Sequence, residues 1–197
     1  FAGDSLPVAP VKQSFRDSKA RLWFGYTNGN ISVLENSSFK LIVPQEDKSG
    51  TINGFAEDSE GRIIVTTQNK GLMRISDDYS IEYISKGLEG KLISSLYLLS
   101  DNNLLLGTFD GLFLYKFLPD GSGLQPAGRF EDIPYTNIQS IVSVKNGEYY
   151  IGTADEGLYL LEINENDTES FSIKKIGEEF DLAYADVQDI FIDENDN

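Results

Sequence analysis

The feature that most constrains the fold of this chain is an internal repeat. Four segments begin at a polar turn, run through an apolar stretch to a pair rich in Gly and Thr, cross a second polar turn and end in another apolar run. They are RLWFGYTNGNI (21–31), GRIIVTTQNKGLM (61–73), NNLLLGTFDGLFL (102–114) and GEYYIGTADEGLYL (147–160). Repetition of this kind predicts a structure built from one unit used several times.

An apolar segment precedes each copy and defines the length of the unit. These segments start at Val11, Ile52, Ile93 and Ile138, with a fifth at Val187, so the starts lie 41, 41, 45 and 49 residues apart. Apolar and polar residues alternate with a period near two, no amphipathic helix is evident, and turn residues recur about every eight to twelve positions. A unit of about 40 residues with four short strands is typical of a β-propeller blade.

The sequence therefore predicts an all-β chain, a β-propeller of four-stranded antiparallel blades at about 11–51, 52–92, 93–137 and 138–186, with the first strand of a further blade at 187–197. In the second unit we expect strands at 52–57, 62–67, 71–76 and 81–84. Propellers close with about four to eight blades. Either four blades close with the last strand placed unusually, or the chain is a segment of a larger ring. We favour the partial ring, because an unpaired inner strand exposes edges.

Trp23, the only tryptophan, has two interpretations: a ligand-stacking residue, or the largest core residue of one repeat copy. The residues at its position in the other copies are also bulky, which favours packing between two blades; they are Ile64, Leu105 and Tyr150. Glycines near the ends of the second strands are expected to permit close packing of adjacent blades, at Gly25, Gly107 and Gly152.

A longer motif surrounds each repeat copy. It consists of a first strand, an Asp-x-x-Gly turn, a Leu-Trp-Phe-Gly-Thr run and a Gly-Leu pair, best matched by DSKARLWFGYTNGNI (17–31) and DSEGRIIVTTQNKGLM (58–73). This motif resembles the two-component regulator propeller repeat over residues 11 to about 176, with departures at Ala20, Tyr26 and Thr66. The resemblance implies the periplasmic sensor region of a hybrid histidine kinase or related regulator of Bacteroidetes-type bacteria. In that family two seven-bladed propellers and a smaller β-sandwich precede a membrane helix, and none of those further parts is visible here.

Composition excludes several classes of function. Sixteen Lys and Arg against thirty-two Asp and Glu give a net charge of −16, which repels phosphate backbones and anionic lipid surfaces. We therefore expect no nucleic-acid partner and no direct membrane insertion. The chain has no cysteine and no histidine, which removes thiolates, imidazole metal ligands and Ser-His-Asp triads. We expect no cofactor, no metal and no catalysis.

Carboxylates remain as candidates for catalysis or ion binding. Adjacent pairs occur at Glu57–Asp58, Glu131–Asp132 and Glu178–Glu179, but neighbours on a strand point to opposite faces, which favours solvated turn carboxylates. DENDN (193–197) begins like a calcium loop without its later Gly and Glu, so we interpret it as a turn after a first strand. The glycosylation patterns at Asn36 and Asn166 are interpreted as ordinary turns.

We expect a ligand on the face that carries the connections between blades and the turns between second and third strands. The candidate residues at the strand starts are Lys12, Asn53, Ser94, Gln139 and Gln188, and those in the turns are Tyr26, Asn28, Gln68, Asn69, Asp110 and Asp155. Amides, hydroxyls, carboxylates and one exposed aromatic suit hydrogen bonding and stacking with a sugar. The same residue types also occur in any polar turn.

Three hypotheses for the function follow. The first is a non-catalytic sensor module on the periplasmic or extracellular face of a bacterial membrane protein, which recognises a carbohydrate or its breakdown product within a homodimeric parent sensor. The second is a scaffold that binds a protein partner in secretion or surface assembly. The third is a polysaccharide-active propeller enzyme, which the absence of histidine disfavours. The repeat predicts the fold, whereas the signalling role follows from the resemblance alone.

Overall fold

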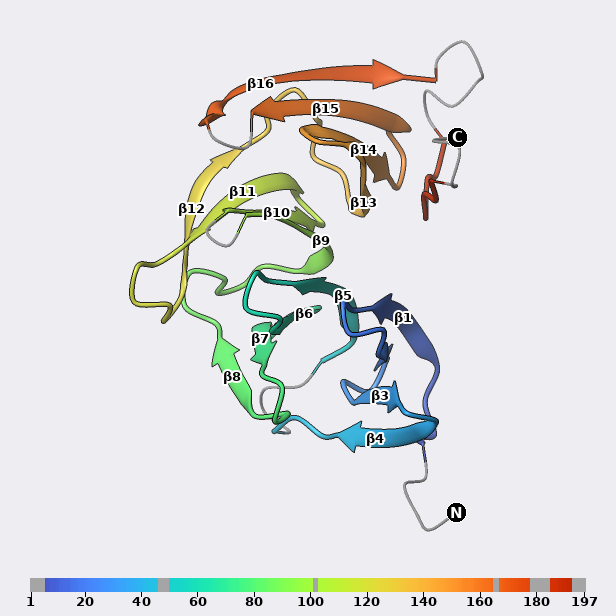
Figure 1. Ribbon diagram of the computed structural model, residues 1–197. Helices are drawn as coiled ribbons and strands as arrows, with labels where there is room; N and C mark the ends of the chain where they lie inside the picture. Colours follow the sequence, from blue (N-terminus) through green and yellow to red (C-terminus); the bar gives the residue numbers. More distant parts are fainter. Residues whose placement is uncertain (1–5, 46–49, 101–102, 165–166, 178–184, 193–197) are drawn as a thin grey trace. The chain divides into compact units, whose positions relative to one another are not determined.

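The computed structural model describes residues 6–45, 50–100, 103–164, 167–177 and 185–192 (Figure 1). Within these ranges the chain forms strands β1 to β16 and no helix. The chain divides into two compact units. The N-terminal unit is Phe1–Ile93 with Phe117–Gln125, and the C-terminal unit is Ser94–Lys116 with Pro126–Asn197.

The strands form four four-stranded antiparallel sheets, in each of which the strands follow one another in chain order. The first sheet contains β1 (Val11–Arg16), β2 (Leu22–Tyr26), β3 (Ile31–Glu35) and β4 (Ser38–Ile42). The second contains β5 (Ile52–Glu57), β6 (Ile63–Thr67), β7 (Gly71–Ile75) and β8 (Ile81–Ile84). The third contains β9 (Ile93–Ser100), β10 (Asn103–Thr108), β11 (Gly111–Phe117) and β12 (Leu124–Arg129). The fourth contains β13 (Ile138–Lys145), β14 (Glu148–Thr153), β15 (Leu158–Asn164) and β16 (Asp167–Ile176).

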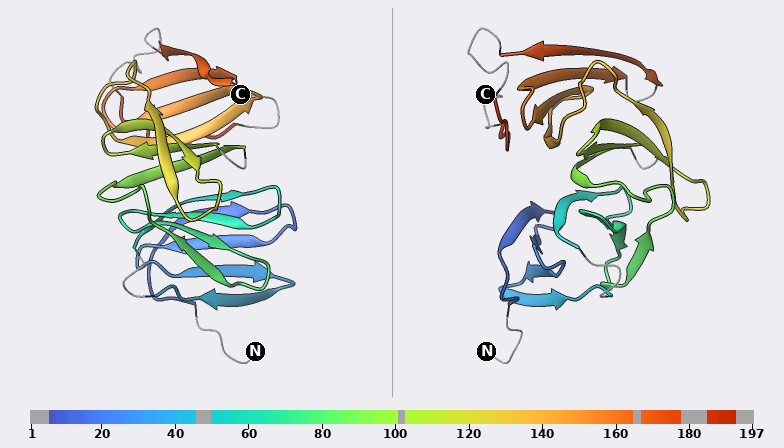
Figure 2. Two further views of the ribbon diagram at one scale, coloured as in Figure 1. Left: turned by 90° about the vertical axis from the view of Figure 1, so that its left-hand side faces the viewer. Right: turned by 180° about the vertical axis from the view of Figure 1, so that it is seen from behind.

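These bounds confirm the predicted repeat. Each sheet begins at the expected apolar residue, and in the second sheet every strand end agrees with the expectation to within one residue. The fold is all-β, with one antiparallel meander for each repeat copy, as expected for propeller blades. In the N-terminal unit the first strands β1 and β5 of the two sheets lie side by side (Figure 2).

The segment after the fourth sheet is described only at residues 185–192, which form no strand. Its Val187 N–H nevertheless donates a hydrogen bond of 2.9 Å to the carbonyl of Thr153, at the end of β14. The expectation that a further blade starts here stays a prediction. The turn expected at 193–197 and the Glu178–Glu179 pair lie outside the described residues.

The core of the N-terminal unit confirms the structural interpretation of Trp23. Its side chain is completely buried in a cluster with apolar residues of both sheets, including Val33, Ile52, Val65 and Met73. The C-terminal unit has a corresponding cluster between its sheets, in which the rings of Tyr97 and Tyr149 pack edge to face at 4.8 Å. In each of these two clusters, apolar side chains from successive blades pack together.

Adjacent blades approach each other closely at the predicted glycines. A Cβ at Gly25 would lie 2.6 Å from Ile52 Cβ, and one at Gly107 would lie 2.8 Å from Ile138 Cγ2. Both neighbours are the first residue of the next blade, so a side chain at either glycine would separate the blades. At Gly152 the added Cβ would lie 2.7 Å from the carbonyl oxygen of Val187.

Candidate functional site

Three connections of the C-terminal unit meet at one end of its sheets. The carbonyl of Asp110 in the β10–β11 turn accepts a hydrogen bond of 3.3 Å from Arg129 Nε. In the β12–β13 loop, the hydroxyl of Thr136 donates to Asp155 Oδ1 in the β14–β15 turn. The structure therefore brings the predicted ligand residues Asp110 and Asp155 to one surface, called here the C-terminal loop face and consisting of residues 109–110, 129–136 and 154–155.

An aromatic ring stands exposed on this surface. Tyr135 is 76% exposed, and its ring centroid lies 4.0 Å from the guanidinium carbon of Arg129. Arg129 also donates to the carbonyl of Ile133 at 2.7 Å and forms an ion pair with Glu131. With its guanidinium held on several sides, Arg129 supports the Tyr135 ring in one place while the other side of the ring faces solvent.

Tyr135 corrects the expectation of where the exposed aromatic lies. That expectation was Tyr26, but Tyr26 is only 4% exposed and its hydroxyl is hydrogen-bonded to Ser32 Oγ at 2.9 Å. The prediction of an exposed Tyr26 is therefore wrong. Tyr26 is the last residue of β2, and in this position its ring belongs to the core.

Two further predicted residues share a carboxylate near the start of β13. Gln139 Nε2 donates to Asp186 Oδ1 at 2.6 Å, and Gln188 Nε2 donates to Asp186 Oδ2 at 2.8 Å. Asp186 was not predicted, because its only signal in the sequence was an acidic residue just before the apolar segment at Val187. The two amides retain their carbonyl oxygens as acceptors; Gln188 is exposed and Gln139 is half-buried.

The predicted residues Asn53 and Ser94 connect first strands to each other. Asn53 is buried and donates from Nδ2 to the carbonyl of Ile93 at 2.7 Å, within the N-terminal unit. Ser94 donates from its hydroxyl to the carbonyl of Ile138 at 2.7 Å, within the C-terminal unit. At these positions the polar side chain bridges one blade to the next.

The remaining predicted residues lie in the N-terminal unit. Asn28 accepts a hydrogen bond of 3.1 Å from the N–H of Asn30 and so caps its own turn. The carbonyl of Gln68 accepts from Ile93 N–H at 2.8 Å. Lys12 and Asn69 are exposed. None of these hydrogen bonds joins the four residues into one cluster, so their role as ligand residues stays a prediction.

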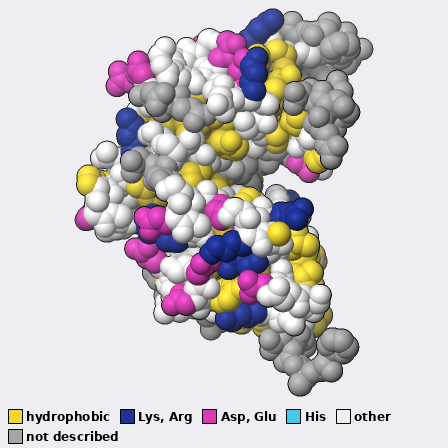
Figure 3. All heavy atoms as spheres, viewed as in Figure 1, with side chains coloured by type: hydrophobic (Ala, Val, Ile, Leu, Met, Phe, Trp, Pro, Cys, Tyr) yellow, Lys and Arg dark blue, Asp and Glu magenta, His cyan; other side chains and the backbone are white. Residues whose placement is uncertain are grey.

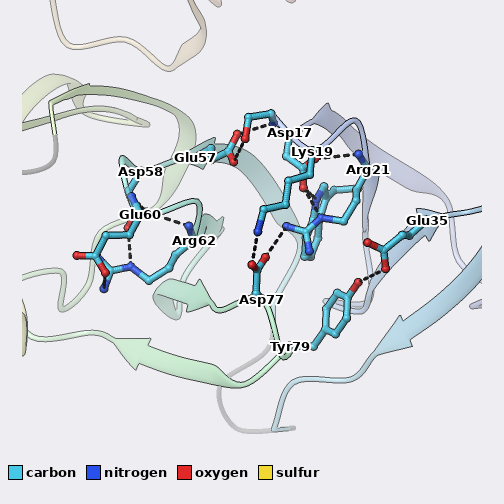
Figure 4. A network of polar contacts seen from close by, with 12 residues as sticks. Asp17, Lys19, Arg21, Glu35, Glu57, Asp58, Glu60, Arg62, Asp77 and Tyr79 are labelled. Carbon is cyan, nitrogen blue, oxygen red and sulfur yellow. Dashed lines mark hydrogen bonds and ion pairs between the residues drawn. The ribbon is translucent and has the colours of Figure 1, made fainter.

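The densest polar network of the N-terminal unit lies around Asp17, in the β1–β2 turn (Figure 4). Asp17 Oδ2 accepts hydrogen bonds from Arg21 Nε at 2.6 Å and from Trp23 Nε1 at 2.8 Å, and Oδ1 accepts from the Arg21 N–H at 2.8 Å. Asp17 and Arg21 are both nearly inaccessible to solvent. Burial alone would raise the pKa of Asp17, but the hydrogen bonds from Trp23 and Arg21 outweigh burial and lower that pKa below its ordinary value.

Residues of the second blade complete the network. Asp77, in the β7–β8 turn, lies between Lys19 and Arg21 and forms an ion pair with each, at 3.2 Å from Arg21 Nη2 (Figure 4). The hydrogen bond from Lys19 is the main cause that lowers the pKa of Asp77. Tyr79 donates from its hydroxyl to Glu35 Oε2 at 3.0 Å. Figure 3 shows Lys, Arg, Asp and Glu side chains gathered on this face of the unit.

The same turn recurs in the second blade in a more exposed form. Asp58 Oδ2 accepts from Arg62 Nε at 2.7 Å, but the Arg62 side chain is 32% exposed. A repeated Asp-Ser-x-x-Arg spacing, in DSKAR (17–21) and DSEGR (58–62), was the sequence signal for both pairs. Every charged group in the Asp17 network has a partner, so its chemistry is structural: it connects turns of two blades.

The carboxylate pairs provide no catalytic dyad within the described residues. Glu57 accepts two hydrogen bonds from Ser18, whereas its neighbour Asp58 accepts from Arg62. Glu131 is paired with Arg129. In the part of the chain that the structure describes, no three acidic residues come close enough to hold a metal ion.

Comparison with known proteins establishes the fold. No protein-family model and no curated protein matches the sequence. Solved structures do match. The extracellular domain of a hybrid two-component system from B. thetaiotaomicron is 17% identical with a TM-score of 0.67, over 98% of this chain and 27% of that one. Two structures of another extracellular domain from this bacterium also match; one is described as part of a one-component system and the other as part of a hybrid two-component system.

Other propellers match as well. Virginiamycin B lyase from Staphylococcus aureus is 19% identical with a TM-score of 0.69, over 87% of this chain and 57% of the lyase. A catalytically inactive variant of that lyase, in which a histidine is replaced by alanine, is also similar. The β-propeller domain of Cps50 (Swd1) from Myceliophteria thermophila is 9% identical with a TM-score of 0.59, over 94% of this chain and 59% of that one.

This chain therefore has the β-propeller fold and spans between about a quarter and somewhat over half of these structures. Among the described residues there is no helix that could cross a membrane.

Proposed function

We propose that this chain is part of a non-catalytic, ligand-sensing propeller module of a two-component regulator, on the periplasmic or extracellular side of a bacterial membrane. The observation that carries the proposal is the likeness to the extracellular domains of two-component systems, which extends over 98% of this chain. Because the chain spans 27% of that domain, we propose that the remainder of a larger sensor protein completes the module.

A lyase activity is the alternative that the structural neighbours suggest. The lyase variant that lacks one histidine is described as catalytically inactive. The 197 residues of this chain contain no histidine, so they do not supply such a group. Of the adjacent carboxylates, Glu57 is engaged with Ser18, Asp58 with Arg62 and Glu131 with Arg129. These observations support sensing over catalysis.

On this proposal the ligand is a carbohydrate or its breakdown product, bound at the C-terminal loop face. The exposed ring of Tyr135 provides a surface on which the C–H groups of a sugar stack. Asp110 and Asp155 provide hydrogen-bond acceptors for sugar hydroxyls, and the amides of Gln139 and Gln188 provide further polar groups nearby. Binding there would shift the population of conformers in a homodimeric parent protein and so pass a signal across the membrane.

The test is a calorimetric titration of the chain with a panel of neutral and acidic oligosaccharides, repeated with Tyr135→Ala. We expect loss of the ring to weaken binding about fivefold, since a stacked aromatic contributes about 1 kcal/mol. The matched control is Phe39→Ala, which removes a partly exposed aromatic from β4 of the other unit and should leave binding unchanged.

Two results would count against the proposal. Failure of every oligosaccharide to bind, combined with capture of a purified protein partner by the same surface, would support the scaffold hypothesis. Degradation of any oligosaccharide during the titration would show an enzyme and contradict a purely sensory role.

A further inference from the structure

A hollow on the outer side of the C-terminal unit borders the C-terminal loop face at Arg129 and Phe130. It encloses about 300 Å³ between the outer strands β12 and β16, next to β11. The residues that line it include Lys116 of β11, Gly128 and Arg129 of β12, and Thr168, Glu169 and Phe171 of β16. A volume of about 300 Å³ is at the lower end of ligand pockets, enough for one sugar-sized ring.

One wall of this groove is an aromatic ring with a fixed orientation. Phe171 is 41% exposed, and its ring packs edge to face against Phe130 at a centroid distance of 4.9 Å. Phe130 itself is only 3% exposed and belongs to the core, as does Leu114 beneath it. The core therefore holds Phe171 while part of its ring remains open to the groove.

The opposite wall leaves room beside the backbone. A Cβ built on Gly128 would meet no atom within 4 Å, so the groove is open at this strand. Lys116 and Glu169 bring one positive and one negative side chain to the same space. Arg129 also lines the groove, but its charge is paired with Glu131. The charges at the groove are therefore largely offset, and it offers donors and an acceptor without selecting a charged ligand.

We propose that this groove binds one sugar ring of a neutral oligosaccharide. The apolar face of the ring stacks on Phe171, and its hydroxyls reach Lys116 and Glu169. The net charge of −16 disfavours an acidic sugar at the same place. The groove shares Arg129 and Phe130 with the C-terminal loop face, but Tyr135 does not line it, and the proposal does not depend on a signalling role.

The experiment uses ligand-observed NMR and calorimetry on the intact chain with maltotriose, cellotriose and mannotriose as neutral probes and trigalacturonate as the acidic one. At least one neutral probe should bind with a Kd below about 10 mM. Gly128→Leu should weaken it at least about tenfold by filling the groove. The thermal midpoint should not fall, since the new side chain enters open space. Phe171→Ala should weaken binding similarly, by removing the stacking surface.

Gln125→Leu is the matched control, because it adds the same apolar side chain to an exposed position of β12 that does not line the groove. It should bind like the unaltered chain. The proposal is overturned if no neutral probe binds, if trigalacturonate binds more tightly than all of them, or if Gly128→Leu leaves the affinity unchanged.

Comparison with Tyr135→Ala separates the two sites. Loss of binding in Gly128→Leu alone would support the groove and remove the evidence for the loop face. Loss in Tyr135→Ala alone would support the loop face and overturn the groove.

Discussion

Ala20, in the β1–β2 turn, has a strained backbone conformation. Ala20 has a φ of 62°, the left-handed region that glycine adopts without steric cost. The equivalent turn of the second blade places Gly61 there, at a φ of 76°. Both turns have the same backbone hydrogen bond, from the Ala20 N–H to the Asp17 carbonyl at 3.0 Å and from the Gly61 N–H to the Asp58 carbonyl at 2.9 Å. The network around Asp17 thus imposes on alanine a conformation that suits glycine.

Ala20→Gly should therefore stabilise the chain. Glycine removes the steric cost of the left-handed conformation, and this gain outweighs the greater conformational entropy that glycine gives the unfolded chain. We expect the free energy of unfolding to rise by about 0.5–1 kcal/mol. Urea denaturation followed by far-ultraviolet circular dichroism measures this change.

The reciprocal change Gly61→Ala is the control. A Cβ at Gly61 has no neighbour closer than 3.7 Å, so its cost comes from φ alone and should be about 1 kcal/mol of destabilisation. Equal and small effects of both substitutions would show that the turn relaxes freely and would contradict the strain at Ala20.

At the scale of elements, blades are joined where the second strand of one meets the first strand of the next. Gly25 and Gly107 provide the close approach, and Asn53 and Ser94 provide hydrogen bonds to the first carbonyl of the following blade. The second blade departs from this pattern at Thr66, whose buried hydroxyl has no hydrogen-bond partner. Close contact between adjacent blades therefore depends more on the missing side chains of Gly25 and Gly107 than on any one polar contact.

Gly25→Ala should open the joint between the first two blades. Its Cβ would overlap with Ile52, a fully buried residue with a stiff branched side chain, so we expect destabilisation of about 1–3 kcal/mol. The measurement is again the urea midpoint, with hydrogen exchange at Ile52 as a local probe.

Gly128→Ala serves as the comparison, because its added Cβ meets no atom within 4 Å. It should change stability by less than about 0.5 kcal/mol. If Gly25→Ala is as stable as Gly128→Ala, the first two blades can move apart without loss of stability.

At the scale of the whole molecule, carboxylates dominate the electrostatics. The chain has thirty-two acidic residues and no histidine, so no side chain of ordinary pKa titrates between about pH 6 and 8. Asp17 and Asp77 have pKa values lowered in the folded state by their partners. A lowered folded pKa contributes stability above the unfolded pKa, and this contribution is lost as the pH falls through the folded pKa.

We therefore expect the free energy of unfolding to be constant between about pH 6 and 8 and to fall below about pH 4. Urea titrations at a series of pH values test this. Asp17→Asn should lower the free energy of unfolding at neutral pH and should make it fall less steeply at acid pH. The exposed Asp132→Asn should do neither. If Asp17→Asn leaves the loss of stability at acid pH unchanged, other carboxylates cause that loss.

The sequence by itself determined the repeat, the start of each blade and the strand bounds of the second blade. These features are local: alternation with a period of two and turn residues act over a few positions, and repetition multiplies the signal. The role of Trp23 and the contacts of Gly25 also followed, because equivalent positions in successive copies have equivalent neighbours.

Only the tertiary structure decided which polar and aromatic groups meet. It placed Tyr135, not Tyr26, at the surface, and it joined Asp77 to Arg21 across two blades. It also showed that the Asn53 side chain is hydrogen-bonded to the carbonyl of Ile93 on the next first strand. The physical reason is that a side chain's exposure and partners depend on contacts between distant segments, which differ between copies of the repeat even where the local pattern is the same.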